Sequence, residues 1–331
     1  MTIGADFTAE TMAYRPELLA HCYRMLGSVH DAEDLVQETL VRAWRAADRF
    51  DEQRASLRTW LYRIATNACL TALEQRGRRA LPTDLNGPAA TLQTRPARHP
   101  EVSWLEPIPD ALLGDSADDP ATVVAARSGI RLAFIAALQY LPARQRAVLI
   151  LRDVLAWSAA EVADLLGTSP AAVNSALQRA RAQLEKATPM IDRTSESLSP
   201  GERAMIDRYV TAFGNGDMDE LSKLLRDDVV LEMPPALLWF AGRAHVVGFF
   251  AAKAARDGDT WRAVPTAANT QPAVAYYLRD ADGTHRAHSI HVLGTTDTAI
   301  ERITVFLGDE LFRPFGLPTV LRRPNENSIP E

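Results

Sequence analysis

Apolar side chains recur every three or four positions through most of residues 14–75, which is the spacing of amphipathic helices. The pattern predicts one helix that Gly27-Ser28 closes, a second over about 31–47, and a third that opens at LRTWLYRIATNACL. A loop, DRFDEQRAS, separates the last two. The predicted inward positions of the second and third helices are Leu35, Val36, Leu40, Ala43, Trp44, Leu57, Leu61, Ile64 and Ala68.

A second stripe runs beside the apolar face of the third helix. Trp60, Arg63 and Asn67 recur at i, i+3 and i+7 and therefore lie in one row. An aromatic ring, a guanidinium and an amide in a row can stack on bases, meet phosphate and contact a base edge. The alternative is a half-buried tryptophan with two solvated polar neighbours, which is common on amphipathic helices.

Prolines and glycines interrupt every regular pattern over residues 81–126. The sequence therefore predicts a linker of more than forty residues, which is long for a passive connection. In its middle lies WLEPIPD, where Trp104, Leu105 and Ile108 are apolar side chains on a proline-stiffened segment. These three residues are predicted to dock on another part of the protein; the alternative is an extended linker with one stray tryptophan.

Helical spacing returns from about residue 127 to 188 and contains a helix-turn-helix pattern. Ser158 and Glu161 form a capping box, Gly167-Thr168 supplies a turn, and Ser169 precedes a proline at the first position of a longer helix. Polar and basic residues occupy the outer face of that helix, which favours DNA recognition in a major groove over a plain helical hairpin.

The remaining part of the chain changes to an α+β pattern after a Ser/Glu-rich hinge. Helical runs come first, with one strand at the end of GNGDMDELSKLLRDDVVLEMPP, and four strand-like runs follow at TWRAVPTAA, AVAYYLRD, HRAHSIHVLG and AIERITVFLG. Consecutive strands predict a curved antiparallel sheet with helices packed on it.

Composition fits a multidomain globular protein. A chain of 331 residues with 47% hydrophobic and 24% charged residues is long enough for two or three domains. The N-terminus lacks the basic-then-apolar order of a secretory signal, and the two cysteines have no metal-type spacing. A cytoplasmic protein without a metal, a cofactor or a disulfide framework is expected.

Net charge is −6, yet the charges separate within the first 80 residues. Asp31, Glu33, Asp34 and Glu38 lie together with no base among them, and an arginine-rich stretch follows from residue 54. This bipolar distribution predicts two partners of opposite charge. The alternative is that the acids stabilise the start of their helix through its dipole.

Taken together, YRMLGSVHDAEDLVQETLVRAW, SLRTWLYRIATNACL and LPARQRAVLILRDVLAWSAAEVADLLGTSPAAVNSALQRARAQL resemble an extracytoplasmic-function (group IV, sigma-70 family) sigma factor of RNA polymerase. The resemblance implies sigma domain 2 over 10–80, a linker over 81–127 and sigma domain 4 over 128–188. The run AFGNGDMDELSKLLRDDVVLEMP is similar to a SnoaL-like, NTF2-type domain, which implies a cone-shaped α+β domain over 200–318.

The resemblance also implies three surfaces, with core RNA polymerase and promoter DNA as partners. Core polymerase would bind Asp31, Asp34, Leu35, Gln37 and Glu38. The −10 element would meet Arg54, Ser56, Arg58, Trp60, Arg63 and Asn67. The −35 element would meet Ser169, Asn174, Ser175, Gln178, Arg179 and Arg181. Asn174 and Ala176 stand where relatives often carry arginine, so phosphate affinity from domain 4 alone should be weak.

The cone fold encloses a pocket, and its relatives include isomerases and polyketide cyclases. A small-molecule ligand is one reading of such a pocket, and a role purely in protein contact is the other. A lone histidine in a strand is more often a core residue than a catalyst, and no Asp–His pair stands out, so we expect no catalytic residue. A cyclase or isomerase fused to DNA-binding helices, or an ordinary helix-turn-helix regulator, would leave the acidic helix unexplained. The candidate lining residues are Met233, Trp239, Phe249, Tyr277, His291 and Phe306.

Overall fold

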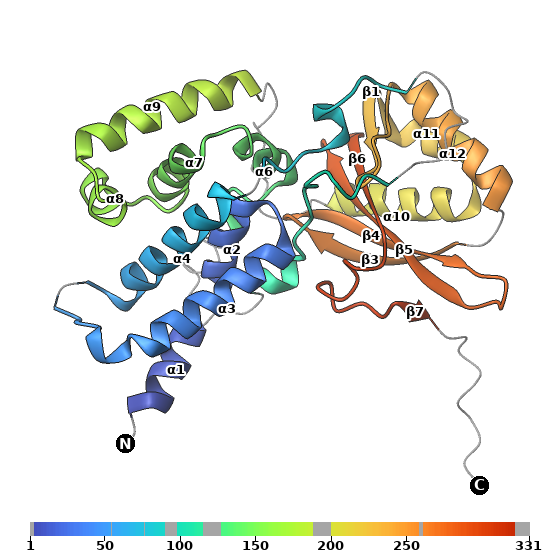
Figure 1. The fold of residues 1–331 in the computed structure, drawn as a ribbon. Coiled ribbons are helices and arrows are strands. Elements are labelled where there is room, and N and C mark those ends of the chain that lie inside the picture. Colours follow the sequence, from blue (N-terminus) through green and yellow to red (C-terminus); the bar gives the residue numbers. More distant parts are fainter. Residues whose placement is uncertain are drawn as a thin grey trace, which may run out of the picture. The chain divides into compact units, whose positions relative to one another are not determined.

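The protein is described by a computed structural model that divides into two compact units (Figure 1). One unit combines residues 1–79 with 105–193, and the other combines residues 80–104 with 194–331. We call them the sigma unit and the C-terminal unit. The structure describes residues 3–53, 55–75, 77–89, 98–114, 127–187, 200–257 and 261–321.

The first half of the sigma unit is a helical bundle. It contains α1 (Ile3–Ala13), α2 (Arg15–Leu26), α3 (Val29–Arg45), a 3-10 turn (Ala47–Arg49) and α4 (Leu57–Glu74). Gly27 ends α2 with φ of 69°, and the Ser28 and Ser56 hydroxyls cap α3 and α4 by accepting the backbone N–H groups of Asp31 and Thr59. The sequence predicted these boundaries but not α1, whose composition gives no clear apolar stripe.

One predicted inward residue of α3 is wrong. Trp44 is 63% exposed, whereas Val36 and Ala43 are fully buried. The helix turns the indole outward because Ala32, Val36, Thr39 and Ala43 complete the buried stripe without it.

The second half of the sigma unit carries the helix-turn-helix. It contains α6 (Leu132–Leu138), α7 (Ala143–Leu149), a π-helical turn (Ile150–Val154), α8 (Ala159–Leu166) and α9 (Pro170–Ala187). The Ser158–Glu161 capping box is confirmed, with Oγ and Oε2 contacts of 3.2 and 2.7 Å. Gly167 has φ of 61°, which lets the chain turn sharply between α8 and α9.

The C-terminal unit packs helices on one mixed sheet (Figure 1). Its helices are α10 (Pro200–Asn215), α11 (Met218–Leu224) and α12 (Arg243–Asp257). Its strands are β1 (Leu225–Glu232), β2 (Trp239–Ala241), β3 (Trp261–Ala268), β4 (Gln271–Arg279), β5 (His285–Thr295), β6 (Ile300–Leu307) and β7 (Val320–Leu321).

The order of the paired strands is β2-β1-β6-β5-β4-β3, with β7 on β5. The four predicted strand runs correspond to β3–β6, and their antiparallel pairing is confirmed. The expectation of an entirely antiparallel sheet is wrong, because β1 runs parallel to β6. This pairing joins segments separated by α12 and four strands, so the local pattern could not reveal its direction.

The predicted linker does not stay outside the folded units. Its described residues 80–89 and 98–104 belong to the C-terminal unit, and residues 105–114 belong to the sigma unit. The chain therefore passes from one unit to the other between Trp104 and Leu105. Within the described residues, no helix is long and apolar enough to cross a bilayer.

Candidate polymerase and promoter interfaces

The outer face of α3 carries the residues predicted to bind polymerase. Asp34, Gln37 and Glu38 are exposed, and Leu35 is partly buried. Asp31 is paired with Arg79, and Glu38 contacts Arg42 at 2.6 Å. The acids therefore form one face, and the folded chain supplies arginine partners for two of them, Arg42 from the next turn of the same helix and Arg79 from a distant part of the sequence.

The row on α4 is confirmed as a structural feature and is partly covered by aromatic packing. Trp60 is half-buried, with its ring 5.1 Å from Phe50 and 6.3 Å from Phe7. Arg63 is partly exposed, and Asn67 is exposed. The half-buried alternative thus describes Trp60 in the free chain, while Asn67 remains accessible to a base.

A buried acid on α2, Glu17, fixes the orientation of α4. Glu17 is 1% exposed and accepts hydrogen bonds from Arg58 Nε at 2.9 Å and Tyr62 Oη at 3.0 Å. Burial, the largest single influence, lowers the pKa of Arg58, but the hydrogen bonds and charges of Glu17 and Tyr62 together outweigh burial, and the net shift of the pKa is upward. Arg58, predicted to meet DNA, therefore has a structural ion pair that the sequence did not reveal.

His21 lies in the same buried layer. Its Nε2 is 2.9 Å from Thr66 Oγ1, and its ring packs edge-on at 5.0 Å from Tyr62. Burial lowers the pKa of His21 to about 3, assisted by the positive charges of Arg24 and Arg58. The imidazole is therefore neutral when the helices are packed.

Domain 4 contacts domain 2 within the sigma unit. Arg63 on α4 forms an ion pair with Asp164 on α8. Trp157 packs 5.5 Å from Tyr62, and the buried Arg146 donates to Met25 O and, at 2.9 Å, to Gln139 Oε1. In this arrangement a predicted −10 residue is engaged by the first helix of the helix-turn-helix.

The outer face of α9 has the polarity that the sequence predicted. Val173, Leu177 and Ala180 are buried. The Ser169 hydroxyl caps the helix by accepting the Ala172 N–H at 3.2 Å. Arg181 forms a bidentate ion pair with Asp153, with N–O distances of 2.8 and 2.6 Å. Exposed residues on the outer face are Asn174, Ser175, Gln178 and Arg179.

A further predicted −10 residue, Ser56, directly precedes α4. Ser56 is exposed and caps the helix through its hydroxyl, which accepts the Thr59 N–H at 3.2 Å. Arg54 lies outside the described residues.

The WLEPIPD segment is buried at all three predicted docking residues. Trp104 is 8% exposed, Leu105 1% and Ile108 0%. Leu105 packs so closely on Gly27 that a Cβ there would lie 2.8 Å from its Cδ1. Glu106 accepts the Ser28 hydroxyl at 2.7 Å, and its carbonyl accepts the Tyr23 hydroxyl at 2.7 Å.

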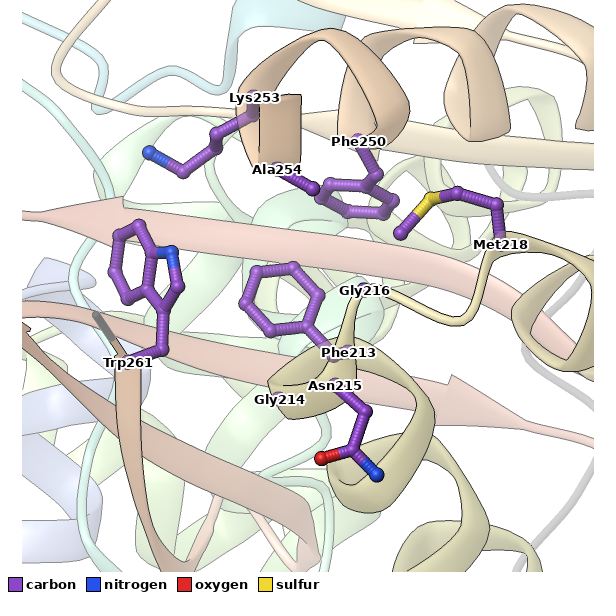
Figure 2. A pocket seen from close by; sticks show the side chains of 9 residues that line it. All are labelled: Phe213, Gly214, Asn215, Gly216, Met218, Phe250, Lys253, Ala254 and Trp261. Carbon is purple, nitrogen blue, oxygen red and sulfur yellow. The ribbon is translucent and has the colours of Figure 1, made fainter. Parts of the chain in front are cut away.

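The residues predicted to line a pocket in the C-terminal unit lie elsewhere. Met233 and Phe306 are buried in packed surroundings, Tyr277 packs 5.1 Å from Phe312, and Phe249 packs 4.9 Å from Phe240. None of the six lines the cavity in Figure 2, which α10, α11, α12 and β3 enclose instead.

The other two predicted pocket residues make structural contacts. Trp239 donates its indole N–H to Asn86 O at 2.9 Å, and His291 Nδ1 lies 3.0 Å from the Tyr209 hydroxyl. Burial lowers the pKa of His291 well below its usual value. His291 is therefore a hydrogen-bonded core residue, which is the role expected of a lone histidine in a strand.

Sequence reasoning missed the partners that define each surface: Phe7, Glu17, Arg79, Asp164 and, at the cavity, Lys253 with Trp261. The first four reach their partners through tertiary packing across dozens of residues, and Lys253 of α12 lies over the Trp261 ring of β3. The separation of acidic and basic residues within the first 80 residues was the one feature of the sequence that could have indicated such pairings.

An all-helical bipolar domain and a helix-turn-helix, joined to an α+β domain, define a transcription factor of the sigma class. The Sigma-70 region 2 model matches residues 11–79, and the Sigma-70, region 4 model matches residues 131–184. The chain is 50% identical over 319 residues to the ECF RNA polymerase sigma factor SigG of Mycobacterium tuberculosis, which covers 96% of this chain and 85% of that protein. The chain belongs to the extracytoplasmic-function sigma factors, which direct RNA polymerase to promoters.

A second relative carries the same architecture in a solved structure. The ECF RNA polymerase sigma factor SigJ of Mycobacterium tuberculosis is 31% identical over 257 residues, which are 76% of this chain and 74% of that protein. The crystal structure of SigJ aligns with a TM-score of 0.62 at 25% identity and covers 94% of this chain and 99% of that one. The predicted combination of sigma domains with an NTF2-type domain is confirmed.

Proposed function

We propose that this sigma factor binds core polymerase through α3, opens and holds the −10 element through α4, and recognises the −35 element through α9. The acidic outer face of α3 suits a basic partner surface, with Asp34 and Glu38 exposed. Asn67 and the Trp60 ring suit an unstacked base, and Gln178 with Arg179 suits base edges in a major groove. The protein would act in the cytoplasm, where core polymerase meets DNA.

The C-terminal unit is proposed to regulate this activity by binding the linker between the two sigma domains. The observation that carries this proposal is the set of linker hydrogen bonds inside that unit. Asn86 Nδ2 donates to Leu237 O at 3.0 Å, Ala89 N donates to Trp239 O at 2.8 Å, and His99 N donates to Pro235 O at 3.0 Å.

The same contact involves a buried acid of β1. Thr83 Oγ1 donates to Glu232 Oε2 at 3.0 Å, and Arg302 holds the other oxygen of this carboxylate at 2.8 Å. Trp104 donates its indole N–H to His99 O at 2.8 Å and is nearly buried. Burial of one such side chain contributes about 1.5–3 kcal/mol, enough to change the ratio of bound to free linker by tenfold or more.

A bound linker restrains the distance that domains 2 and 4 can span. The chain leaves the sigma unit after Arg79 and returns to it at Leu105. Binding of residues 80–104 by the C-terminal unit therefore shortens the free tether between domains 2 and 4. Tether length sets the effective concentration of one DNA-binding domain once the other is bound. The C-terminal unit would thereby tune promoter use.

A binding role for the C-terminal unit is favoured over catalysis. His291 is buried, neutral and bonded to Tyr209, and Glu232 is held by Arg302 and Thr304. Both groups therefore lack the accessibility that a general acid or base needs.

The polymerase surface is tested by charge reversal on α3. Asp34→Lys with Glu38→Lys should reduce capture of core polymerase from purified components by at least about tenfold, because close charge pairs at interfaces are strongly coupled. Asp219→Lys, which reverses an exposed acid of the C-terminal unit, serves as the matched control. Unchanged capture by the folded double variant would refute the assignment.

A further inference from the structure

The C-terminal unit contains a cavity at the end of α10, with a volume of about 380 Å³. Side chains from α10, α11, α12 and β3 surround it (Figure 2). Pockets for small molecules commonly have volumes of about 300–1,000 Å³, so this one is large enough for a small ligand.

Three aromatic rings from separate elements form its walls. Phe213 of α10 lies edge-on to Phe250 of α12 at 5.2 Å and to Trp261 of β3 at 6.0 Å. Met218 adds an apolar and flexible side chain beside Phe250 (Figure 2). Such walls suit a flat apolar group.

The aromatic wall is supported from behind. Phe213 is 7% exposed and packs 4.5 Å from Tyr276 and 5.2 Å from His291. Both supporting rings are buried, so they hold Phe213 in place at the cavity wall. The space is therefore a feature of the packed fold.

A single cationic side chain lines the cavity. Among the residues that line the cavity, all of them described, Lys253 is the charged one. Its Nζ lies 4.4 Å from the centre of the Trp261 ring, and Figure 2 shows the Asn215 amide directed away from the aromatic side chains. An ammonium beside aromatic walls provides one cationic group at which the site can recognise an anion.

Glycine keeps part of the wall open. Gly214 lines the cavity, and a Cβ built on it would meet no atom within 4 Å. A larger side chain at 214 can therefore occupy open space at the cavity without a clash at its first carbon.

We propose that this cavity binds a small planar aromatic carboxylate, with the ring among Phe213, Phe250 and Trp261 and the carboxylate on Lys253 Nζ. The ligand adds a signal to the regulatory role proposed above for the C-terminal unit. Binding itself requires neither polymerase nor DNA, so the two proposals can fail separately.

The test is calorimetric titration of the full-length chain with 2-naphthoate, and with its neutral analogue 2-naphthamide. We expect saturable binding of one 2-naphthoate per chain and binding of 2-naphthamide at least about tenfold weaker, because a charge-assisted hydrogen bond is lost. Lys253→Met should weaken 2-naphthoate by the same factor. Lys223→Met removes a charge from α11 outside the cavity and should leave the affinity unchanged.

A blocking pair of variants tests the location independently of charge. Gly214→Leu should abolish binding, whereas Gly214→Ala should retain it. If Gly214→Leu fails to fold, the preference for 2-naphthoate and its loss in Lys253→Met decide the question.

The proposal is overturned if the wild-type chain binds no 2-naphthoate at millimolar concentration, if the two probes bind equally, or if Lys253→Met binds as tightly as wild type. A chain that binds 2-naphthoate but not polymerase would refute the proposed function alone. A chain that directs transcription but ignores both probes would refute the ligand site alone.

Discussion

At the scale of single residues, side chains assigned to DNA are engaged by other parts of the sigma unit. Arg63 pairs with Asp164, and Arg58 pairs with Glu17. The two pairs differ in burial, since Glu17 is buried whereas the Asp164 side chain is 73% exposed. The Arg63–Asp164 pair is accordingly a reversible surface contact, whereas the Arg58–Glu17 pair is part of the core.

Release of Arg63 should strengthen binding of the free chain to single-stranded −10 DNA. Asp164→Asn removes a surface ion pair, which contributes about 0–1 kcal/mol, so affinity should rise by up to about fivefold. Fluorescence anisotropy with a labelled −10 strand measures it. Asp153→Asn breaks the exposed Arg181 pair and controls for the loss of one acid. An equal rise in both variants would argue against a specific contact.

His21 should make the stability of the sigma unit depend on pH. Its pKa is about 3 when folded, against an ordinary value of 6.5, so the unfolded chain takes up a proton first as pH falls. Stability is therefore full above pH 6.5 and is lost progressively below it. At pH 5.5 the loss should reach about 1.4 kcal/mol.

Hydrogen exchange of α2 and α4 peptides at pH 7.5 and 5.5, corrected for the intrinsic effect of pH, measures this loss. His21→Gln cannot titrate, so its exchange should show a smaller pH dependence whatever its absolute stability. An unchanged dependence in that variant would assign the effect to other groups.

At the scale of elements, local patterns predicted the helix boundaries where a cap or a glycine marks them. Gly27 and the Ser158–Glu161 box stand where expected, α4 begins directly after the predicted loop, and β3–β6 follow the predicted runs. Propensity and periodicity act within a few residues, which is why these features could be read from the sequence.

Features that depend on distant partners could not be predicted in the same way. The parallel pairing of β1 with β6, the outward turn of Trp44 and the cavity at Phe213 arise from tertiary packing. The resemblance to sigma factors supplied the surfaces of the site, but it did not reveal which side chains pair in the free chain.

The recognition helix α9 should read bases through two neighbouring exposed side chains. Gln178→Ala and Arg179→Ala should each lower use of a matched −35 element by about 1–3 kcal/mol and alter base preference there. Arg181→Ala is the matched control, because its guanidinium is bound to Asp153. Transcription from a library of −35 variants measures the preference.

A uniform loss across all −35 sequences would contradict base recognition by Gln178 and Arg179. It would indicate that these side chains contact only phosphate. A change in base preference in Arg181→Ala would show that the Asp153 ion pair opens on DNA.

At the scale of the whole molecule, one chain holds two DNA-binding domains and a third domain that captures the segment between them. Residues 80–89 and 98–104 are bonded inside the C-terminal unit, whereas Leu105 and Ile108 are buried in the sigma unit. The division falls between adjacent apolar residues, so loss of either anchor changes the free length of the linker. The central claim is that this capture controls transcription.

Run-off transcription by reconstituted polymerase tests that claim most directly. The four chains compared are wild type, Trp104→Ala, a truncation after residue 199 and their combination. Because Trp104 is proposed to act through the C-terminal unit, both single changes should shift transcription in the same direction, and the combination should equal the truncation alone. Strictly additive effects, or a truncation without effect, would contradict the account.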